Sequence, residues 1–356
     1  MVTAAGSVEV MRRYYACRHC GQTHTPLDAW AGVEKGHLTV GAKQLVCLAA
    51  TVWSFDHASR HLETFTGLAV SDQTIRRVAH AEGLKVQAWL EGSRLSTGAV
   101  VAAEGNAEFL TDGAMVNTTE GWQETRLSIF SKRPPGEAVD PAAFTVLDDR
   151  RLPPPAAQLV LVSKRPSVEM GELWGRMAVR LGWDRGVGVS AISDGARWIA
   201  AEEEKALPRA ERVVDVYHVS EHLHACGAAL HGERTEAARA WAGEQLVTLV
   251  REGAAVLLWR LQRDAESAAT PSARAALEAL LTYLRPNEKA LNYAQRLRKG
   301  QPIGSGQVEG ACKTIFGRRL KLNSARWTPA NVAPFASLCA ADHVGLGPVY
   351  WTARAA

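Results

Sequence analysis

The segment that most constrains this chain is a glycine- and serine-rich turn that leads into a short helix carrying the acid Glu309. Residues 301–313 are Gln-Pro-Ile-Gly-Ser-Gly-Gln-Val-Glu-Gly-Ala-Cys-Lys. Between Arg285 and Arg326 the chain holds ten Lys or Arg and only two Asp or Glu, while the whole protein has a net charge of +4. An acid in so basic a segment requires a cationic partner or a metal ion.

Two further acids favour a metal ion over a cationic side chain as the partner of Glu309. Asp112 and Asp194 each follow an apolar run and precede Gly-Ala, which predicts an aspartate at the carboxyl end of a buried strand in both cases. Ligands of open α/β sheets gather at that edge. Oxygen donors of this kind are preferred by hard divalent ions. The pattern therefore predicts a two-metal phosphoryl-transfer site with Mg²⁺, or alternatively Mn²⁺, at Asp112, Asp194 and Glu309.

Asp215 and His218 lie at the end of another predicted strand, residues 213–217, and allow two interpretations. They form either a hydrogen-bonded pair that orients the sheet edge, or a pair that steers metal ligands or phosphate. Asp215 is also an alternative to Asp194 as the second metal ligand. We favour Asp194, because the glycine that follows it lets backbone approach closely.

Length and composition predict a soluble protein of two or more domains. The chain has 356 residues, of which 47% are hydrophobic and 22% charged. It has no run of 18 apolar residues and no signal-peptide pattern, so we expect a cytoplasmic protein without a membrane partner. Its six cysteines do not form a disulfide framework. The basic pI of about 8.8 permits a polyanionic partner.

Cys17 and Cys20 form a Cys-x-x-Cys-Gly turn that predicts a zinc knuckle within residues 1–30. Two thiolates fill half of a tetrahedral zinc site, and the sequence offers no second Cys pair. Zinc binding therefore stays open, and the alternative is a free or redox-sensitive pair of thiols.

Three helices are predicted between residues 38 and 95, at about 41–53, 56–66 and 72–82. Ser71 is placed to cap the third helix and Gly83 to end it. A capped third helix with a polar face is typical of a helix-turn-helix module that reads DNA. Any three-helix packing module would show the same periodicity.

From residue 104 onward the pattern changes to alternating strands and helices, which predicts a mixed α/β sheet. The stretch 219–299 has no strand signal and predicts about four helices inserted before Glu309. Strands are predicted at 109–111, 123–131, 159–162, 186–193 and 213–217, and helices at 168–181 and from Trp198 to Leu207.

Several groups of residues together give the chain a resemblance to a known family. They are Tyr-Tyr-Ala-Cys-Arg-His-Cys-Gly at 14–21 with Pro-Leu-Asp at 26–28, Thr-Asp-Gly-Ala at 111–114, Gly-Trp-Gln-Glu at 121–124 with Arg-Leu at 126–127, Ser-Asp-Gly-Ala at 193–196, Asp-Val-Tyr-His-Val-Ser-Glu-His-Leu at 215–223, Gly-Ser-Gly-Gln-Val-Glu at 304–309, Arg-Arg-Leu-Lys at 318–321 and Arg-Trp at 326–327. With these motifs the chain resembles, over nearly its whole length, bacterial insertion-sequence transposases of the DDE type. The specific resemblance is to the ISKra family, which is similar to the Mutator-like group.

The resemblance implies an RNase H-like catalytic core with a mixed five-stranded sheet in residues 104–218 and 300–345, and an all-helical insertion at 219–299. It implies that Asp112, Asp194 and Glu309 form the DDE triad. The family's Asp/Cys-x-x-His signature falls on Asp215 and His218.

The implied activity is Mg²⁺-dependent cutting of DNA at the ends of an insertion sequence, followed by transfer of the freed 3′ hydroxyl to target DNA. The implied partner is double-stranded DNA, bound by a homo-oligomer associated with the nucleoid. The basic run near residue 320 would hold phosphates and the helix at 72–82 would read bases. The residues expected to contact DNA are Gln73, Arg76, Arg77, Arg318, Arg319, Lys321 and Arg326.

Some departures from the family motivate other interpretations. Relatives carry a Cys pair upstream of the knuckle that this sequence lacks, a glycine-containing turn where Asn323-Ser324-Ala325 stands, and a basic residue where Cys339 stands. One alternative is a truncated, non-transposing derivative that occupies element ends as a repressor or competitor. Another is an RNase H-like nuclease without strand transfer.

Overall fold

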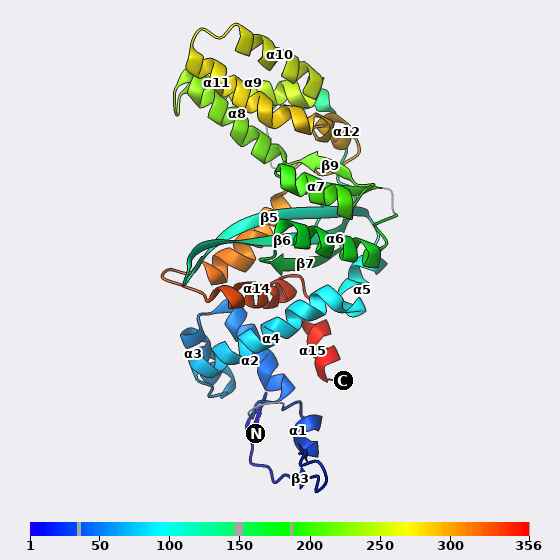
Figure 1. The fold of residues 1–356 in the computed structure, drawn as a ribbon, viewed down its shortest axis with the longest axis vertical. Coiled ribbons are helices and arrows are strands. Elements are labelled where there is room, and N and C mark those ends of the chain that lie inside the picture. The colour runs from blue at the N-terminus through cyan, green and yellow to red at the C-terminus, as the bar shows by residue number, and fades with distance from the viewer. Residues whose placement is uncertain (34–36, 146–151, 186–187, 356) are drawn as a thin grey trace.

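The computed structural model describes residues 1–33, 37–145, 152–185 and 188–355. Figure 1 shows an elongated molecule, with a helical bundle at one end, a β-sheet in the middle and a small N-terminal segment at the other end. None of the helices in these ranges combines the length and apolar character that a membrane span requires.

The sheet has five strands in the order β7-β6-β5-β8-β9 and confirms the predicted mixed α/β class. Strands β5 (Asn106–Thr118) and β6 (Gly121–Arg133) form a long antiparallel hairpin, and β7 (Ala157–Ser163) adds antiparallel to β6. Strand β8 (Val189–Ser193) pairs in parallel with β5, and β9 (Glu211–Val214) pairs in parallel with β8. Parallel neighbours require crossover connections. These connections contain α6 (Ser167–Leu181) and α7 (Arg197–Ala206), in front of the sheet in Figure 1.

Aromatic side chains fasten α6 to the sheet. Trp174 of α6 is fully buried, and its ring centroid lies 5.1 Å from that of Phe109 on β5. Its indole nitrogen donates a hydrogen bond to the Ser128 hydroxyl of β6, 2.8 Å away. Replacing such a buried aromatic side chain by alanine typically costs about 3–5 kcal/mol of stability. These contacts hold α6 against one face of the sheet.

Two predicted strand ends were wrong. Strand β5 does not stop at Asp112 but continues to Thr118, because β6 pairs with it along the whole hairpin. The parallel neighbour β8 pairs with β5 only as far as Leu110, so Asp112 still lies just beyond the end of that pairing. Strand β9 ends at Val214 rather than at 217, because Asp215 caps the helix α8 (Val216–His231) that begins there.

The N-terminal segment contains two short hairpins and one short helix. The first hairpin joins β1 (Val2–Thr3) to β2 (Gly6–Ser7). The second joins β3 (Tyr15–Ala16) to β4 (Thr23–His24), with Cys17 and Cys20 exposed in its turn. Helix α1 (Pro26–Trp30) follows.

The three predicted helices of the next segment are present as α2 (Val40–Val52), α3 (Phe55–Thr66) and α4 (Asp72–Gly92). Ser71 caps α4 as predicted, accepting a hydrogen bond from the Thr74 amide. Gly83, however, does not end the helix. A β-carbon there would lie 2.7 Å from the carbonyl oxygen of Pro334, so the glycine instead allows α4 to pack closely against α14 (Pro329–His343). Helix α5 (Arg94–Ala102) then leads to the sheet.

The predicted all-helical stretch before Glu309 is confirmed. After α8 come α9 (Glu236–Glu252), α10 (Ala254–Glu266) and α11 (Pro271–Leu284), which form the bundle at the end of the molecule in Figure 1. Residues 313–320 form a π-helical segment, labelled η3. The remaining elements are η1 (Pro141–Ala143), η2 (Arg285–Ala290), α12 (Tyr293–Arg298), α13 (Gly306–Cys312), η3 (Lys313–Leu320) and α15 (Gly347–Ala355).

Candidate functional site

Three aspartates meet at one edge of the sheet. Asp112 lies on β5, Asp194 directly follows β8 and Asp215 directly follows β9, and these strands are neighbours. Burial raises the pKa of the Asp112 carboxyl, and the charges of Asp194 and Asp215 raise it further. The Gly113 amide, 2.7 Å from Asp112 Oδ1, and the cationic His218 oppose that rise. The predicted convergence of Asp112 and Asp194 at a common edge is therefore present.

The carboxylate of Asp215 is fully occupied by partners within the protein. It is only 2% exposed, and its Oδ2 accepts hydrogen bonds from Ser305 Oγ at 2.5 Å and from His218 Nδ1 at 3.0 Å. Its Oδ1 accepts one from the Tyr217 amide at 3.0 Å. Burial alone would raise the pKa of Asp215, but these hydrogen bonds together bring it below its ordinary value. Because both oxygens of Asp215 already accept hydrogen bonds, Asp194 is the more available carboxylate of the two.

His218 carries a positive charge next to these acids. Its hydrogen bond to Asp215 raises the pKa of the imidazole to about 9, although burial opposes the rise, and the charges of Asp215, Glu221 and Asp194 add to it. The side chain is therefore protonated at neutral pH. An imidazolium at a carboxylate cluster offers a hydrogen-bond donor and a positive charge to an anionic substrate.

The loop after β8 is held by the helical bundle. The Tyr283 hydroxyl of α11 donates a hydrogen bond to the backbone oxygen of Asp194 at 2.9 Å, and Asn287 donates one to the backbone oxygen of Gly195 at 3.3 Å. Gly195 has φ of +82°, and a β-carbon there would lie 3.0 Å from the Asn287 amide nitrogen. The bundle therefore fixes the backbone that carries the Asp194 side chain.

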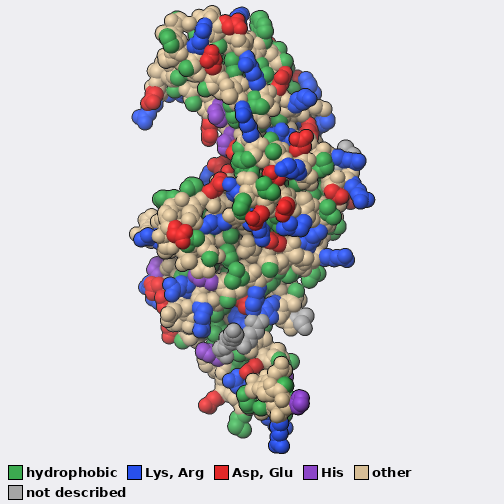
Figure 2. All heavy atoms as spheres, in the orientation of Figure 1, with side chains coloured by type: hydrophobic (Ala, Val, Ile, Leu, Met, Phe, Trp, Pro, Cys, Tyr) green, Lys and Arg blue, Asp and Glu red, His purple; other side chains and the backbone are tan. Residues whose placement is uncertain are grey.

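A cavity of about 320 Å³ opens beside Asp194, between the sheet edge and the bundle. Figure 2 shows the outline of the molecule hollowed between bundle and sheet, with histidine and acidic side chains gathered there. His222 stacks on Tyr283 at one wall, with ring centroids 3.7 Å apart. The cavity lining includes Asp194, Arg197, His218, His222 and Tyr283. The cavity therefore joins an acidic edge to cationic and aromatic walls.

Glu309 lies on α13, which packs against β5, the strand that carries Asp112. The Cys312 thiol shows this proximity, because burial first and then the charges of Asp112 and Glu309 raise its pKa to about 12. The Glu309 side chain is 57% exposed and forms an ion pair with Lys313 at 2.7 Å. Glu309 therefore lies near the edge that carries the aspartates, but its carboxylate is turned to a lysine.

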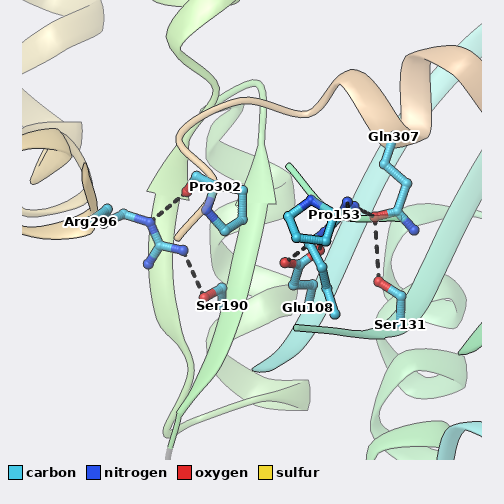
Figure 3. A network of polar contacts seen from close by, with 8 residues as sticks. Glu108, Ser131, Pro153, Ser190, Arg296, Pro302 and Gln307 are labelled. Carbon is cyan, nitrogen blue, oxygen red and sulfur yellow. Dashed lines mark hydrogen bonds and ion pairs between the residues drawn. The ribbon is translucent and has the colours of Figure 1, made fainter. Parts of the chain in front are cut away.

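The turn before α13 is anchored to the sheet by two buried arginines (Figure 3). Arg133 of β6 binds the carboxylate of Glu108 at 2.9 Å and the side-chain oxygen of Gln307 at 2.5 Å. Arg296, fully buried, donates to the Pro302 backbone oxygen at 2.7 Å and, 2.8 Å away, to the Ser190 hydroxyl of β8. Together with the hydrogen bond between Ser305 and Asp215, this network sets where α13 begins.

Within the described ranges, no three His, Cys, Asp or Glu side chains are grouped so that they could hold a metal ion as they stand. The chemistry of the donors nevertheless suits a hard divalent cation, because the charges of Asp194 and Asp215 raise the pKa of Asp112 and a cation would offset them. Asp112 and Asp194 fit such an ion, and Glu309 would have to exchange Lys313 for it.

Zinc binding at the knuckle stays a prediction. Cys17 and Cys20 are exposed. Hydrogen bonds from the backbone of Cys20 and of His19, and then from the Cys20 side chain, lower the pKa of the Cys17 thiol. A lowered thiol pKa favours the thiolate form that binds metals, but the described residues supply no third ligand.

The residues predicted to contact DNA are mostly exposed. Those on α4 lie at its solvent-facing N-terminal end, and the basic run near residue 320 is exposed except for Arg319, which is 4% exposed and packed among aromatic rings. The exposed members are Gln73, Arg76, Arg77, Arg318, Lys321 and Arg326.

Sequence reasoning did not identify the residues that hold the site together. Tyr283, Asn287 and Arg296 lie in the helical stretch, where the sequence shows only amphipathic periodicity and a proline break. Ser305 was part of a recognised turn, but its bond to Asp215 crosses 90 residues. No local signal could have revealed these contacts, because each depends on how distant segments meet.

No protein-family model and no curated protein sequence among those searched matches this chain. The family resemblance therefore stays a prediction from the motifs.

Proposed function

We propose that this protein is a DNA transposase of the DDE type, with an RNase H-like core and Asp112, Asp194 and Glu309 as its triad. The observation that carries this proposal is the meeting of Asp112 and Asp194 at one sheet edge beside the α13 segment that bears Glu309. The strand order, in which only β6 runs against the other strands, supports the RNase H-like assignment.

In this proposal Asp112 and Asp194 would hold Mg²⁺, and Glu309 would join them after leaving Lys313. Bound Mg²⁺ would supply an acidified water and neutralise charge on the phosphate. Asp215 keeps His218 protonated, so that its imidazolium faces the negative charge of the scissile strand. Tyr283 and Asn287 keep the Asp194 backbone in place while DNA enters the cavity between sheet and bundle.

The overall reaction has two steps. Hydrolysis breaks a phosphodiester bond at the element end and leaves a 3′ hydroxyl. That hydroxyl then attacks a phosphodiester of target DNA, forming one new bond while the target strand's own 3′ oxygen leaves. The exposed arginines and Lys321 would hold the DNA backbone by charge, so we expect binding to weaken steeply with salt.

The test is cleavage and joining of DNA carrying the ends of the element that surrounds the gene. We expect Mg²⁺-dependent nicked and joined products from the natural protein. Cleavage by Asp112→Asn and by Asp194→Asn should fall by more than ~10–100-fold, which is the loss caused by removing a residue that only supports a metal ligand. Glu104→Gln, an exposed acid ahead of β5, is the matched control and should be unaffected. Unchanged cleavage by Asp112→Asn would refute the site.

A second candidate is a DNA-binding derivative that occupies element ends without cutting them. The ion pair between Glu309 and Lys313, and the open arrangement of the acids in the described structure, favour it. Binding to the end sequences with no Mg²⁺-dependent product would support this function and exclude the enzyme. Nicked DNA with no joined product would instead indicate a nuclease.

A further inference from the structure

A second cavity, of about 340 Å³, lies away from the aspartates, where the α3–α4 helices meet the loop at 322–328. Its described lining contains three arginines and one histidine and no Asp or Glu. Serine, threonine and asparagine side chains complete its polar lining, and Phe55 and Trp327 provide aromatic walls. Positive charge thus gathers around an open space without a counter-ion from the lining.

Arg319 is the buried cation of this cavity. Its guanidinium lies 4.6 Å from the ring centroid of Phe55, 5.3 Å from that of Trp327 and 4.9 Å from that of Phe335. Its Nε donates to the Ala50 backbone oxygen at 2.7 Å, but its Nη2 is buried and has no hydrogen-bond partner in the described structure. The aromatic faces offset part of the cost of burying this charge. The unused donor leaves a further part uncompensated.

His80 adds a second unused nitrogen. Its ring lies among Phe55, Trp327 and Phe335, and its Nε2 is buried without a partner in the described part of the chain. Burial lowers the pKa of His80, and the positive charges of Arg76 and Arg319 lower it further. The groups around the cavity therefore repel one another, and an anion would relieve that repulsion.

The cavity has an open mouth and a buried floor. Arg76 of α4 and Arg326 of the loop are both exposed and both line the cavity, although they are far apart in the sequence. Arginine presents several N–H donors in a planar fork that suits the oxygens of a phosphate. A single phosphate group would thus contact two segments that are far apart in the sequence.

We propose that this cavity binds one phosphate of a DNA backbone and thereby fastens α4 to the loop at 322–328. The identity of the ligand as DNA rests on the proposed function, whereas the phosphate chemistry rests on the cavity alone. In this arrangement Arg76 and Arg326 hold the phosphate at the mouth, and Arg319 stabilises it from the floor.

The experiment uses the full chain and two probes, inorganic phosphate and duplex DNA of the element ends. Thermal unfolding is followed with phosphate and with chloride at matched ionic strength. Phosphate should raise the unfolding temperature of the natural protein more than chloride does. Arg76→Ala and Arg326→Ala should abolish the difference, while Arg60→Ala and Arg94→Ala, at exposed arginines that do not line the cavity, should keep it.

In DNA binding, Arg76→Ala and Arg326→Ala should each lower the slope of log Kd against log salt by about 1, as expected for one lost phosphate contact. The double variant should lower it no further, because both arginines hold the same phosphate. Phosphate should also compete with DNA for the natural protein.

Two results would overturn the proposal. One is an equal response to phosphate and chloride in the natural protein, and the other is loss of the phosphate response in Arg60→Ala or Arg94→Ala as well. A phosphate response together with unchanged DNA binding in Arg76→Ala would overturn the assignment of DNA as the ligand. Failure of Mg²⁺-dependent cleavage would refute the proposed enzyme while leaving the phosphate response intact, so the two failures are distinguishable.

Discussion

The hydroxyl of Tyr283 lies 2.9 Å from the backbone oxygen of Asp194, although 89 residues separate them in the chain. Through this hydrogen bond a helix of the bundle touches the loop that carries a proposed metal ligand. The contact supports the view that the bundle is part of the site and not only a neighbour of it.

Replacing Tyr283 by phenylalanine tests whether the bundle positions Asp194 or only lies beside it. The variant keeps the stacked ring against His222 but loses the hydrogen bond, which should cost about 0.5–1.5 kcal/mol in the free energy of unfolding measured with urea. Loss of a partner beside a metal ligand should also raise the Mg²⁺ concentration needed for half-maximal cleavage by ~10–100-fold. Thr282→Ala is the control, because Thr282 lines the same cavity but bonds only within its own helix. An unchanged Mg²⁺ requirement in Tyr283→Phe would show that the bond does not position the ligand.

The pair His218 and Asp215 should make stability depend on pH above neutrality. The pKa of His218 is raised from 6.5 to about 9 in the folded protein, so folding favours the protonated form. The resulting stabilisation is complete below about pH 6.5 and is lost as the pH rises through about 9. Asp215→Asn should return the His218 pKa toward its ordinary value. NMR titration of the histidine signals in both proteins tests this, and a midpoint for His218 near 6.5 in the natural protein would contradict it.

Gly83→Ala should destabilise the protein even though alanine favours helices by about 1 kcal/mol. The added β-carbon would lie 2.7 Å from the Pro334 backbone oxygen, so α4 and α14 would have to separate. Overpacking of this kind typically costs about 1–3 kcal/mol. Gly92→Ala, in the same helix with no atom within 4 Å, should be neutral or stabilising. Urea unfolding of both variants measures the difference, and equal stabilities would be inconsistent with the close packing.

Arg296→Met should be strongly destabilising, by about 3–5 kcal/mol, because it leaves the partners of a buried cation unpaired. Arg296 is fully buried and binds Glu211 Oε2 at 2.9 Å in addition to Pro302 and Ser190. The exposed neighbour Arg298→Met should change stability by less than about 0.5 kcal/mol. Chemical denaturation gives both values. A small effect at Arg296 would mean that the turn before α13 is held by other contacts.

The sequence was sufficient to predict the elements whose signals are local. Apolar runs located the strands, and Ser71 located the start of α4, since a helix cap is a local hydrogen bond. The sequence predicts a helix end at Gly83, and this prediction is wrong. A glycine can also permit close packing of two helices, and here it does so against α14, which the local sequence does not reveal. The sequence predicts that β5 ends at Asp112, but the strand continues to Thr118. Its end depends on pairing with β6, which the local sequence does not reveal.

The candidate site likewise combines features that local sequence predicts with features that depend on tertiary packing. A shared edge for Asp112 and Asp194 followed from strand ends, but the partners of Asp215 and the orientation of Glu309 toward Lys313 are products of tertiary packing. The buried position of Arg319 is a further example, since a run of basic residues gives no sign of which one turns inward. The assigned roles of these residues in DNA chemistry stay predictions.

The chain leaves the sheet for the bundle and comes back to it at almost the same point. The Val216 amide donates to the Ile303 backbone oxygen at 3.0 Å, next to the bond between Asp215 and Ser305. The bundle is therefore joined to the sheet at its base, where Tyr283 and Asn287 also hold the loop that carries Asp194. Because these contacts are confined to the base, the far end of the bundle can change in length without moving the strands that carry the acids.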